Sequence, residues 1–362
     1  MKNFKIKLDK LSKCVNIYIL KFKAKEKKMK KISLILVTLL LVSGMIFAQG
    51  TNEANAKKLM GVVTPAADHG FTAESIKHCE AAVKEVCEAN GYTYRFVNAG
   101  ESGEQSNGVE TILAMNPDVF LLWPVTGDEL RSAAQSIQDA GVPLIIYDRF
   151  IEGFQPTAEI SGDNTTIGLD CGRYFNNYFA EDLSMGKVNY LEFKGDSSTV
   201  PMERTNGFLE TANSNFNLVQ SFVTNWSQQT SMEQMENFLN TKSKEEIESI
   251  KAIFTHDDEI VFGIVEALKN YDGPANINIK LISGVSGGKG YMDLFENPPF
   301  KDIDFITYTF SPSMVRDAVD LAVKVLKGET LEKNYKVPTE VIDKTNYEEY
   351  MMEDLYKVRY SL

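Results

Sequence analysis

The chain has 362 residues, with 38 lysines and arginines against 50 aspartates and glutamates, a length that suits one large or two medium domains. Residues 1–48 hold 12 lysines, one aspartate and one glutamate, so residues 49–362 carry 26 basic and 48 acidic side chains. The resulting net charge of −22 on this main part argues against nucleic acid as a partner.

Residues 1–48 have the features of an export signal. A basic pair next to Met29 precedes an apolar run over residues 32–47, and Ala48 follows with a small side chain. The run is short for a membrane-spanning helix. We therefore predict a signal peptide that is cleaved near Ala48, and a periplasmic protein. We also expect the true start at Met29, with residues 1–28 as an artefactual extension; the alternative is an uncleaved signal anchor.

After a polar linker at residues 49–57, short apolar runs alternate with amphipathic stretches. The pattern predicts strands at residues 59–63, 92–97, 119–123, 144–147, 158–161, 187–193, 219–223, 252–255, 279–283 and 303–309, with one more extended piece near 335–342. It predicts helices at residues 72–90, 104–115, 127–140, 164–179, 202–211, 231–239, 259–270, 290–296 and 314–326. This alternation at short spacing indicates parallel sheets with right-handed crossovers.

The alternation occurs twice along the chain. It predicts an α/β protein of two similar, doubly wound parallel-sheet lobes joined by a multi-strand hinge. We place the N-terminal lobe at residues 58–162 plus about 311–335, and the C-terminal lobe at residues 163–310 plus about 336–350. A crevice between two such lobes is a preferred ligand site, and the carboxyl ends of the strands line it.

Motifs for catalysis and metal binding are missing from the sequence. There is no nucleophile elbow and no phosphate-binding loop, and the Gly-rich segment 284–290 is more typical of a flexible turn. The three histidines have no metal-binding spacing. Cys79, Cys87 and Cys171 follow the signal, and this odd number favours buried thiols over disulfides. We therefore predict no catalytic residue, no cofactor and no metal.

Aromatic residues stand at or just after three predicted strands. Phe71 ends the loop that follows the first strand, and His69 in the same loop is a further candidate. Trp123 ends the third strand, and Trp226, the other of only two tryptophans, follows a strand of the second lobe. Flat rings at such places can stack on the C–H face of a sugar. Each ring alone is also explained by a core position or, for Phe71, by a hydrophobic staple.

Asp148 and Arg149 form a charged pair at the end of an otherwise apolar strand. A carboxylate next to a guanidinium can hold a polyhydroxylated molecule from both sides. The alternative is a strand-end ion pair that caps a neighbouring loop.

Arg204 stands at a predicted helix start, where the helix dipole disfavours a cation. A ligand in the cleft would explain this position, and so would a salt bridge to Glu203 or Asp196. Three acids follow the strand at residues 252–255. One of them is expected to cap the next helix, which leaves another, such as Asp257, to face the cleft.

Several ordered motifs together make the chain resemble the periplasmic sugar-binding proteins of ABC transporters. This cluster contains the ribose-, xylose- and galactose/glucose-binding proteins and shares its fold, the type I periplasmic binding fold, with the LacI repressor core. The resemblance covers roughly residues 58–342. It is carried by Tyr147-Asp148-Arg149, Gly162-Asp163-Asn164, Glu203-Arg204-Thr205-Asn206-Gly207-Phe208, Asp257-Asp258-Glu259, Gly263, Glu266-Ala267-Leu268 and Lys324-Val325-Leu326-Lys327-Gly328-Glu329.

The resemblance implies roles for the strand-end residues. Phe71 and Trp226 match ring-stacking aromatics, Asp148 and Arg149 match a hydroxyl-binding pair, and Arg204 matches a second arginine. Four positions depart from the usual pattern: Asp257 replaces an Asn, Trp123 falls where Asn is common in some members, Ser286 occupies the place of a cleft Asp, and Phe310 replaces Asn or Gln. The expected pocket is therefore more aromatic and less polar.

These observations lead to one expected function. We expect a monomeric, exported solute-binding protein that is not an enzyme, captures a small sugar (a pentose or hexose) between its lobes and delivers it to an ABC permease. The alternative is a sugar sensor that feeds a chemoreceptor or a membrane kinase.

Overall fold

The computed structural model describes residues 57–67, 70–353 and 356–357. The chain divides into the units Met1–Lys57 and Lys58–Leu362, and every element below belongs to the second unit. The predicted signal peptide and its cleavage site lie outside the described residues. Within the described part, no helix combines the length and the apolar composition needed to cross a membrane.

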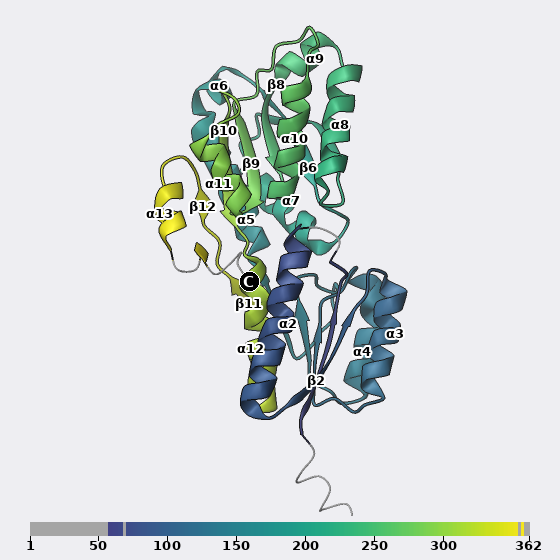
Figure 1. Ribbon diagram of the computed structural model, residues 1–362. Helices are drawn as coiled ribbons and strands as arrows, with labels where there is room; N and C mark the ends of the chain where they lie inside the picture. Colours follow the sequence, from purple (N-terminus) through teal and green to yellow (C-terminus); the bar gives the residue numbers. More distant parts are fainter. Residues whose placement is uncertain (1–56, 68–69, 354–355, 358–362) are drawn as a thin grey trace, which may run out of the picture. The chain divides into compact units, whose positions relative to one another are not determined.

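The first sheet has six parallel strands in the order β11-β5-β4-β3-β1-β2 (Figure 1). Its strands are β1 (Leu59–Thr64), β2 (Thr93–Asn98), β3 (Val119–Leu122), β4 (Leu144–Tyr147), β5 (Ala158–Gly162) and β11 (Asn334–Val337). One face is covered by α2 (Gly70–Asn90) and α12 (Val315–Leu326), and the other by α3 (Ser102–Leu113), η1 (Asp128–Leu130) and α4 (Arg131–Asp139). With helices on both faces, β3 and β4 are buried along their whole length.

The second sheet repeats this strand order as β12-β10-β9-β8-β6-β7, with only β12 antiparallel. Its strands are β6 (Val188–Lys194), β7 (Phe216–Val223), β8 (Ile250–Thr255), β9 (Leu281–Ser286), β10 (Asp304–Thr309) and β12 (Val341–Ile342). One face packs against α5 (Asn164–Tyr178), α6 (Ala180–Met185) and α7 (Thr199–Thr211), and the other against α8 (Gln228–Thr241), α9 (Lys244–Ser249), α10 (Asp258–Asn270), α11 (Lys289–Glu296) and α13 (Tyr347–Met352).

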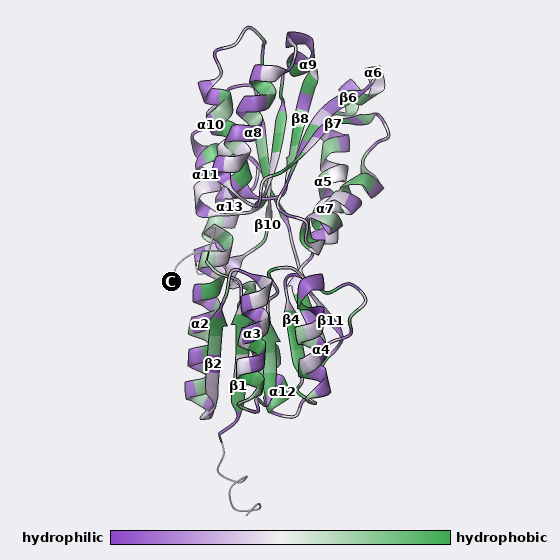
Figure 2. Ribbon diagram, turned by 90° about the vertical axis from the view of Figure 1, so that its right-hand side faces the viewer, coloured by the Kyte–Doolittle hydropathy of each residue, from purple (hydrophilic) through white to green (hydrophobic). Residues whose placement is uncertain are grey.

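The predicted fold class is confirmed, because two α/β sheets with the same order of strands follow one another in the chain. The chain passes between them after β5, between β10 and η2 (Pro312–Met314), and between β11 and β12. The predicted limits of the lobes stay a prediction. Cys79, Cys87 and Cys171 are buried, as expected, and Figure 2 shows how hydrophobic the strands of the first sheet are compared with the surrounding helices.

The sequence pattern missed three short helices and divided the tail wrongly. The helices α6, α9 and α13 have six residues each, too short for a periodic pattern, although Ser243 and Glu246 form a capping box at the start of α9. The extended piece expected near residues 335–342 is two strands, β11 and β12, which pair with different sheets. Pairing in separate sheets depends on tertiary contacts and leaves no local signal.

A close approach of α5 and α7 fixes the position of Arg204. The two helices meet at Gly168 and Gly207, where a Cβ atom on Gly207 would lie 2.5 Å from the carbonyl oxygen of Thr165. A Cβ atom on Gly168 would overlap the carbonyl oxygen of Arg204 and lie 2.8 Å from the backbone nitrogen of Phe208. Glycine is thus required for steric reasons at this helix contact.

Gly168→Ala is expected to push α7 away from α5 and to lower the free energy of unfolding by about 1–3 kcal/mol, the usual cost of overpacking. Urea denaturation measures this change. Gly103→Ala is the matched control, because no heavy atom lies within 4 Å of its added Cβ; this helical substitution should raise stability by at most about 1 kcal/mol. Equal stability of the two variants would contradict the account of the α5–α7 contact.

Candidate functional site

One cavity at the carboxyl ends of both sheets brings together eight of the ten residues singled out in the sequence. They are Phe71, Trp123, Asp148, Arg149, Arg204, Trp226, Asp257 and Phe310, and Val200 completes the lining. Phe71 comes from the start of α2, Arg204 from α7, and the others follow or end strands. We call this the central cavity. Its free volume is about 20 Å³, roughly enough for a single water molecule.

The two remaining candidates are Ser286 and His69. Ser286, the last residue of β9, lines a second cavity instead, which shares Phe71 and Asp257 with the first. We call this second cavity, of about 220 Å³, the adjoining cavity. His69 lies outside the described residues.

Three aromatic rings form one wall of the central cavity. The ring of Phe71 lies 5.2 Å from that of Phe310 and 6.2 Å from that of Trp123, measured between centroids. Trp123 is only 1 % exposed and packs edge-on against Tyr147 at 5.0 Å. Phe71 lies in the first turn of α2 rather than in the loop before it, because the helix begins two residues earlier than expected, at Gly70.

Asp148 directly follows β4 in a left-handed backbone conformation, with φ of 66°. Asp and Asn are among the few residues other than glycine that adopt this region. The turn directs the carboxylate to Trp123, whose indole nitrogen Nε1 donates to Oδ2 over 3.1 Å. The other oxygen, Oδ1, is buried and has no hydrogen-bond partner among the described residues. Burial raises the pKa of Asp148 in spite of Arg149 and Arg204 nearby.

Arg149 connects the two sheets through Asp196, in the loop after β6. Its Nη2 lies 3.3 Å from Asp196 Oδ2, and its Nη1 donates to the carbonyl oxygen of Val125 over 2.6 Å. The indole of Trp226 donates to the same Asp196 oxygen over 2.8 Å. Burial opposes ionisation of Asp196, but Arg149 and hydrogen bonds from Ser198 and Trp226 outweigh it and lower the pKa. The Nε of Arg149 is buried without a hydrogen-bond partner in the described part of the chain.

Arg204 lies in the second turn of α7, which corrects its predicted position at a helix start. The helix begins at Thr199, three residues earlier than expected, because Pro201 is tolerated in a first turn. Arg204 Nε donates to Asn164 Oδ1 over 2.9 Å, and Nη1 donates to the carbonyl oxygen of His256. Its guanidinium carbon lies 4.6 Å from the centre of the Phe310 ring and 5.9 Å from that of Trp226, a cation–π arrangement.

The two carboxylates suggested as salt-bridge partners of Arg204 pair elsewhere. Glu203 lies 3.8 Å from Lys336, and Asp196 pairs with Arg149. Burial lowers the pKa of Arg204 to about 10, against the attraction of Asp257 and Asp148. The guanidinium is therefore a buried cation whose bonds go mainly to neutral oxygens.

Asp257 caps α10, where its Oδ1 accepts from the backbone nitrogen of Glu259 over 2.8 Å. One acid caps this helix, as expected, and the same acid, Asp257, also lines the central cavity. The next residue, Asp258, is held by the backbone nitrogen of Gly288 at 3.0 Å and by the hydroxyl of Thr307 at 2.7 Å.

Three residues of the site were not singled out in the sequence. Asn164 and Val200 follow the strands β5 and β6 at helix starts, and Asp196 lies in the loop after β6. The rule that strand ends line the site applies to Asp196, which sequence analysis considered only as a partner for Arg204. Asn164 entered the sequence analysis only as part of the Gly162-Asp163-Asn164 motif, without a role at the site, and nothing in the local sequence marks Val200.

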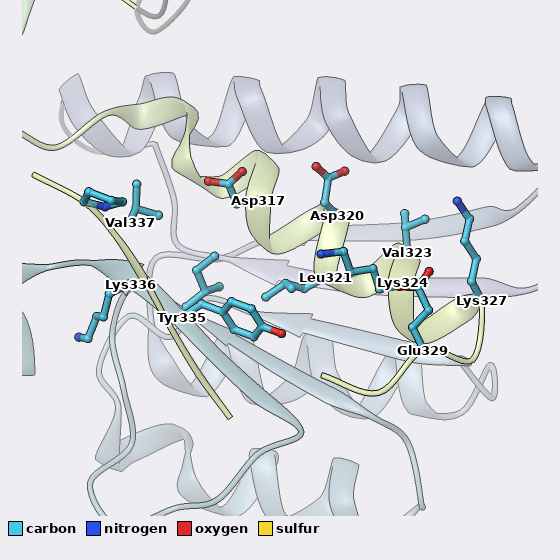
Figure 3. Close-up of a pocket in the computed structure, with 12 residues that line it drawn as sticks. Asp317, Asp320, Leu321, Val323, Lys324, Lys327, Glu329, Tyr335, Lys336 and Val337 are labelled. Carbon is cyan, nitrogen blue, oxygen red and sulfur yellow. The ribbon is translucent and has the colours of Figure 1, made fainter. Parts of the chain in front are cut away.

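A larger groove lies elsewhere, between α12 and β11, and holds about 510 Å³ (Figure 3). Its charged side chains are of both signs, for example Asp317, Asp320, Lys324 and Lys327. None of its lining residues has a buried polar atom without a partner among the described residues, whereas the central cavity has two, on Asp148 and Arg149. Unsatisfied buried polar groups favour the central cavity as the functional site.

Candidate metal ligands do not cluster at either site. Among the residues that the structure describes, no group of three or more His, Cys, Asp or Glu side chains could hold a metal ion. What the central cavity offers is stacking surface, hydrogen-bond acceptors from carboxylates and donors from two guanidinium groups.

Comparison with known proteins shows which family the chain belongs to. A periplasmic binding protein domain matches residues 60–330, which is most of the chain. The chain therefore belongs to the periplasmic binding protein family.

Similar proteins agree with this assignment. The chain is 24 % identical over 312 residues to a ribose import binding protein of Bacillus subtilis, covering 85 % of this chain and 94 % of the relative. A Mycobacterium smegmatis protein solved in complex with β-D-fucofuranose has the same fold, with a TM-score of 0.71, 21 % identity and coverage of 83 % and 96 %. The fructose-binding periplasmic domain of a hybrid two-component system is also similar, with a TM-score of 0.68, 21 % identity and coverage of 82 % and 93 %.

Asp258→Asn is expected to change how stability depends on pH. Burial raises the pKa of Asp258 to about 7, from 3.8 in an ordinary environment. The folded state therefore holds this proton more tightly, and the stability that protonation provides is lost as pH rises from about 4 to about 7. The Asn side chain of the variant does not titrate, so the variant does not lose this stability. Between about pH 4 and pH 7, the free energy of unfolding of the variant minus that of the parent should therefore increase by about 2–4 kcal/mol.

Urea denaturation of both proteins at several pH values measures this difference. Asp170→Asn is the control, because Asp170 is on the surface of α5 and pairs with Arg173 at 2.7 Å; its curve should run parallel to that of the parent. A parallel curve for Asp258→Asn would show that the buried carboxyl does not titrate in this range.

Proposed function

We propose that the protein captures a small sugar, a pentose or hexose, in the central cavity and delivers it unchanged to an ABC permease. Membership of the periplasmic binding protein family supports this function, and so does the name of the relative from Bacillus subtilis. Of the two similar structures, one was solved in complex with β-D-fucofuranose and the other is a fructose-binding periplasmic domain. We propose further that the protein is exported, that its signal peptide is cleaved near Ala48, and that it acts as a monomer without catalysing a reaction.

The observation that carries the proposal is the combination of rings and unsatisfied polar atoms in one cavity. A hydroxyl group can donate to Asp148 Oδ1, and another can accept from Arg149 Nε, since neither atom has a hydrogen-bond partner among the described residues. The rings of Phe71 and Trp226 supply flat apolar surface for the C–H faces of the same molecule. A sugar presents both kinds of surface at once.

A ligand enters only if the two sides of the cavity separate. A volume of about 20 Å³ is far below the hundreds of Å³ typical of small-molecule sites. Two contacts join residues after β4 to residues after β6: the Arg149–Asp196 ion pair and a 3.3 Å hydrogen bond from the Phe150 backbone nitrogen to Thr199 Oγ1. We propose that both contacts break on opening and form again when the sheets close on the sugar.

Asp148→Asn is expected to weaken sugar binding at least about tenfold. Hydrogen bonds to charged groups contribute about 1.5–3 kcal/mol each, and about 1.4 kcal/mol corresponds to a factor of ten. Asn tolerates the left-handed backbone at this position, so the variant removes the charge with little strain. Arg204→Lys, which keeps the charge and loses the planar fork, should weaken binding by a similar factor. Calorimetric titration with the monosaccharide that most raises the melting temperature measures both effects.

Asp170→Asn serves as the control for charge removal, and thermal melts of all variants without ligand confirm that they fold. The proposal fails if no monosaccharide stabilises the protein. The assignment of the central cavity fails if folded Asp148→Asn and Arg204→Lys proteins bind the sugar as tightly as the parent does.

A further inference from the structure

The adjoining cavity lies next to the proposed sugar site and is ten times larger. It is formed by the starts of α2 and α10, the turn between β9 and α11, and Pro312. Phe71 and Asp257 line both cavities, so they form the wall between them. A molecule that stacks on Phe71 in the central cavity can therefore place a substituent beside Asp257, in the adjoining cavity.

Acidic side chains outnumber basic ones in the lining of the adjoining cavity. Its lining contains four acids and one lysine: Glu74, Asp257, Asp258, Glu259 and Lys289. Glu74 has a cation of its own, because it pairs with Lys77 at 2.6 Å. In the described part of the chain, no lysine, arginine or histidine nitrogen forms an ion pair with any of the three consecutive acids at the start of α10. Burial raises the pKa of each of these three acids.

The carboxylate of Asp257 has one oxygen free for a ligand. Its Oδ1 accepts from the backbone nitrogen of Glu259, but Oδ2 accepts no hydrogen bond from a described residue. The residue is only 8 % exposed, and it lines both cavities. A carboxylate oxygen in this position can accept a hydrogen bond from a ligand.

A protonated amine satisfies this site better than a hydroxyl group does. An ammonium group brings three donors and a positive charge, whereas a hydroxyl brings one donor and leaves the excess negative charge in place. Phe71 lines the same cavity, and an aromatic ring is a further favourable neighbour for an ammonium group. A simple amine without hydroxyl groups would leave Asp148 and Arg149 unsatisfied.

We propose that the preferred ligand is an amino-substituted sugar or cyclitol whose protonated primary amine lies beside Asp257 in the adjoining cavity, a ligand class that rests on the sugar-binding function proposed above. The hydroxylated ring stacks in the central cavity against Phe71 and Trp226. Glu259, whose carboxylate lies at the start of α2 against Gly70, adds a second negative charge near the amine.

The test is a calorimetric titration of the purified protein near neutral pH with matched pairs of ligands: D-glucosamine against D-glucose, and D-galactosamine against D-galactose. In each pair one amine replaces one hydroxyl group. At least one amino sugar should bind about tenfold or more tightly than its neutral partner. In Asp257→Asn this preference should fall to less than about threefold.

Two further variants serve as a second test and as a control for the effect of Asp257→Asn on the preference for the amine. Glu259→Gln should reduce the preference for the amine as well, and it provides a second measurement if Asp257→Asn does not fold. Asp317→Asn is the control for removing a carboxylate elsewhere, because Asp317 is an exposed residue of α12 that lines the groove described above and neither cavity. This control should keep the full preference.

The possible failures are distinguishable. If the neutral sugars bind as tightly as their amino partners, or if folded Asp257→Asn keeps the preference, the inference about the amine is overturned while the sugar-binding function stands. If neither kind of sugar binds, both the inference and the proposed function are overturned.

Discussion

The structure of the site depends on keeping the Arg204 guanidinium buried between two sheets. Burial of a cation is costly unless its donors are satisfied, and here Asn164, the carbonyl of His256 and the face of Phe310 supply the partners. The donors point in fixed directions because glycines let α5 and α7 approach closely. A cation held in this way draws the carboxylates Asp148 and Asp257 into the same cavity, and that brings acceptors and donors together.

Opposite charges also link the two sides of the cavity. Asp196 receives both the Arg149 guanidinium and the Trp226 indole, so one carboxylate in the loop after β6 joins a residue after β4 to a ring after β7. A ligand that enters must compete with these contacts or use them. The same electrostatics explain the difference between the two cavities. Arginines balance the acids of the central cavity, Asp257 included, whereas Asp258 and Glu259 in the adjoining cavity form no ion pair with a described residue.

Much of this site was predictable, because the carboxyl ends of parallel strands converge wherever such sheets form. Asp148, Arg149, Trp123 and Trp226 were found by this rule alone. Ser286 also stands at the end of a strand, yet it lines the adjoining cavity instead of the central one. Which cavity it lines depends on how the turn after β9 folds. At position 257 the sequence has Asp where the family resemblance implies Asn, and this difference already indicated an additional acidic group at the site. Two features could not be predicted because they follow from tertiary packing. One is the left-handed backbone of Asp148 and Trp226, with φ of 66° and 60°. The other is the set of hydrogen-bond partners of Arg204.

The two tryptophans of the chain both line the central cavity, so intrinsic tryptophan fluorescence reports on this cavity alone. The central claim is that this cavity is where the sugar binds. Titration with the monosaccharide or amino sugar that stabilises the protein should change the emission in a saturable way, with the same dissociation constant as calorimetry gives. A ligand that binds by calorimetry and leaves the emission of both tryptophans unchanged would contradict the account.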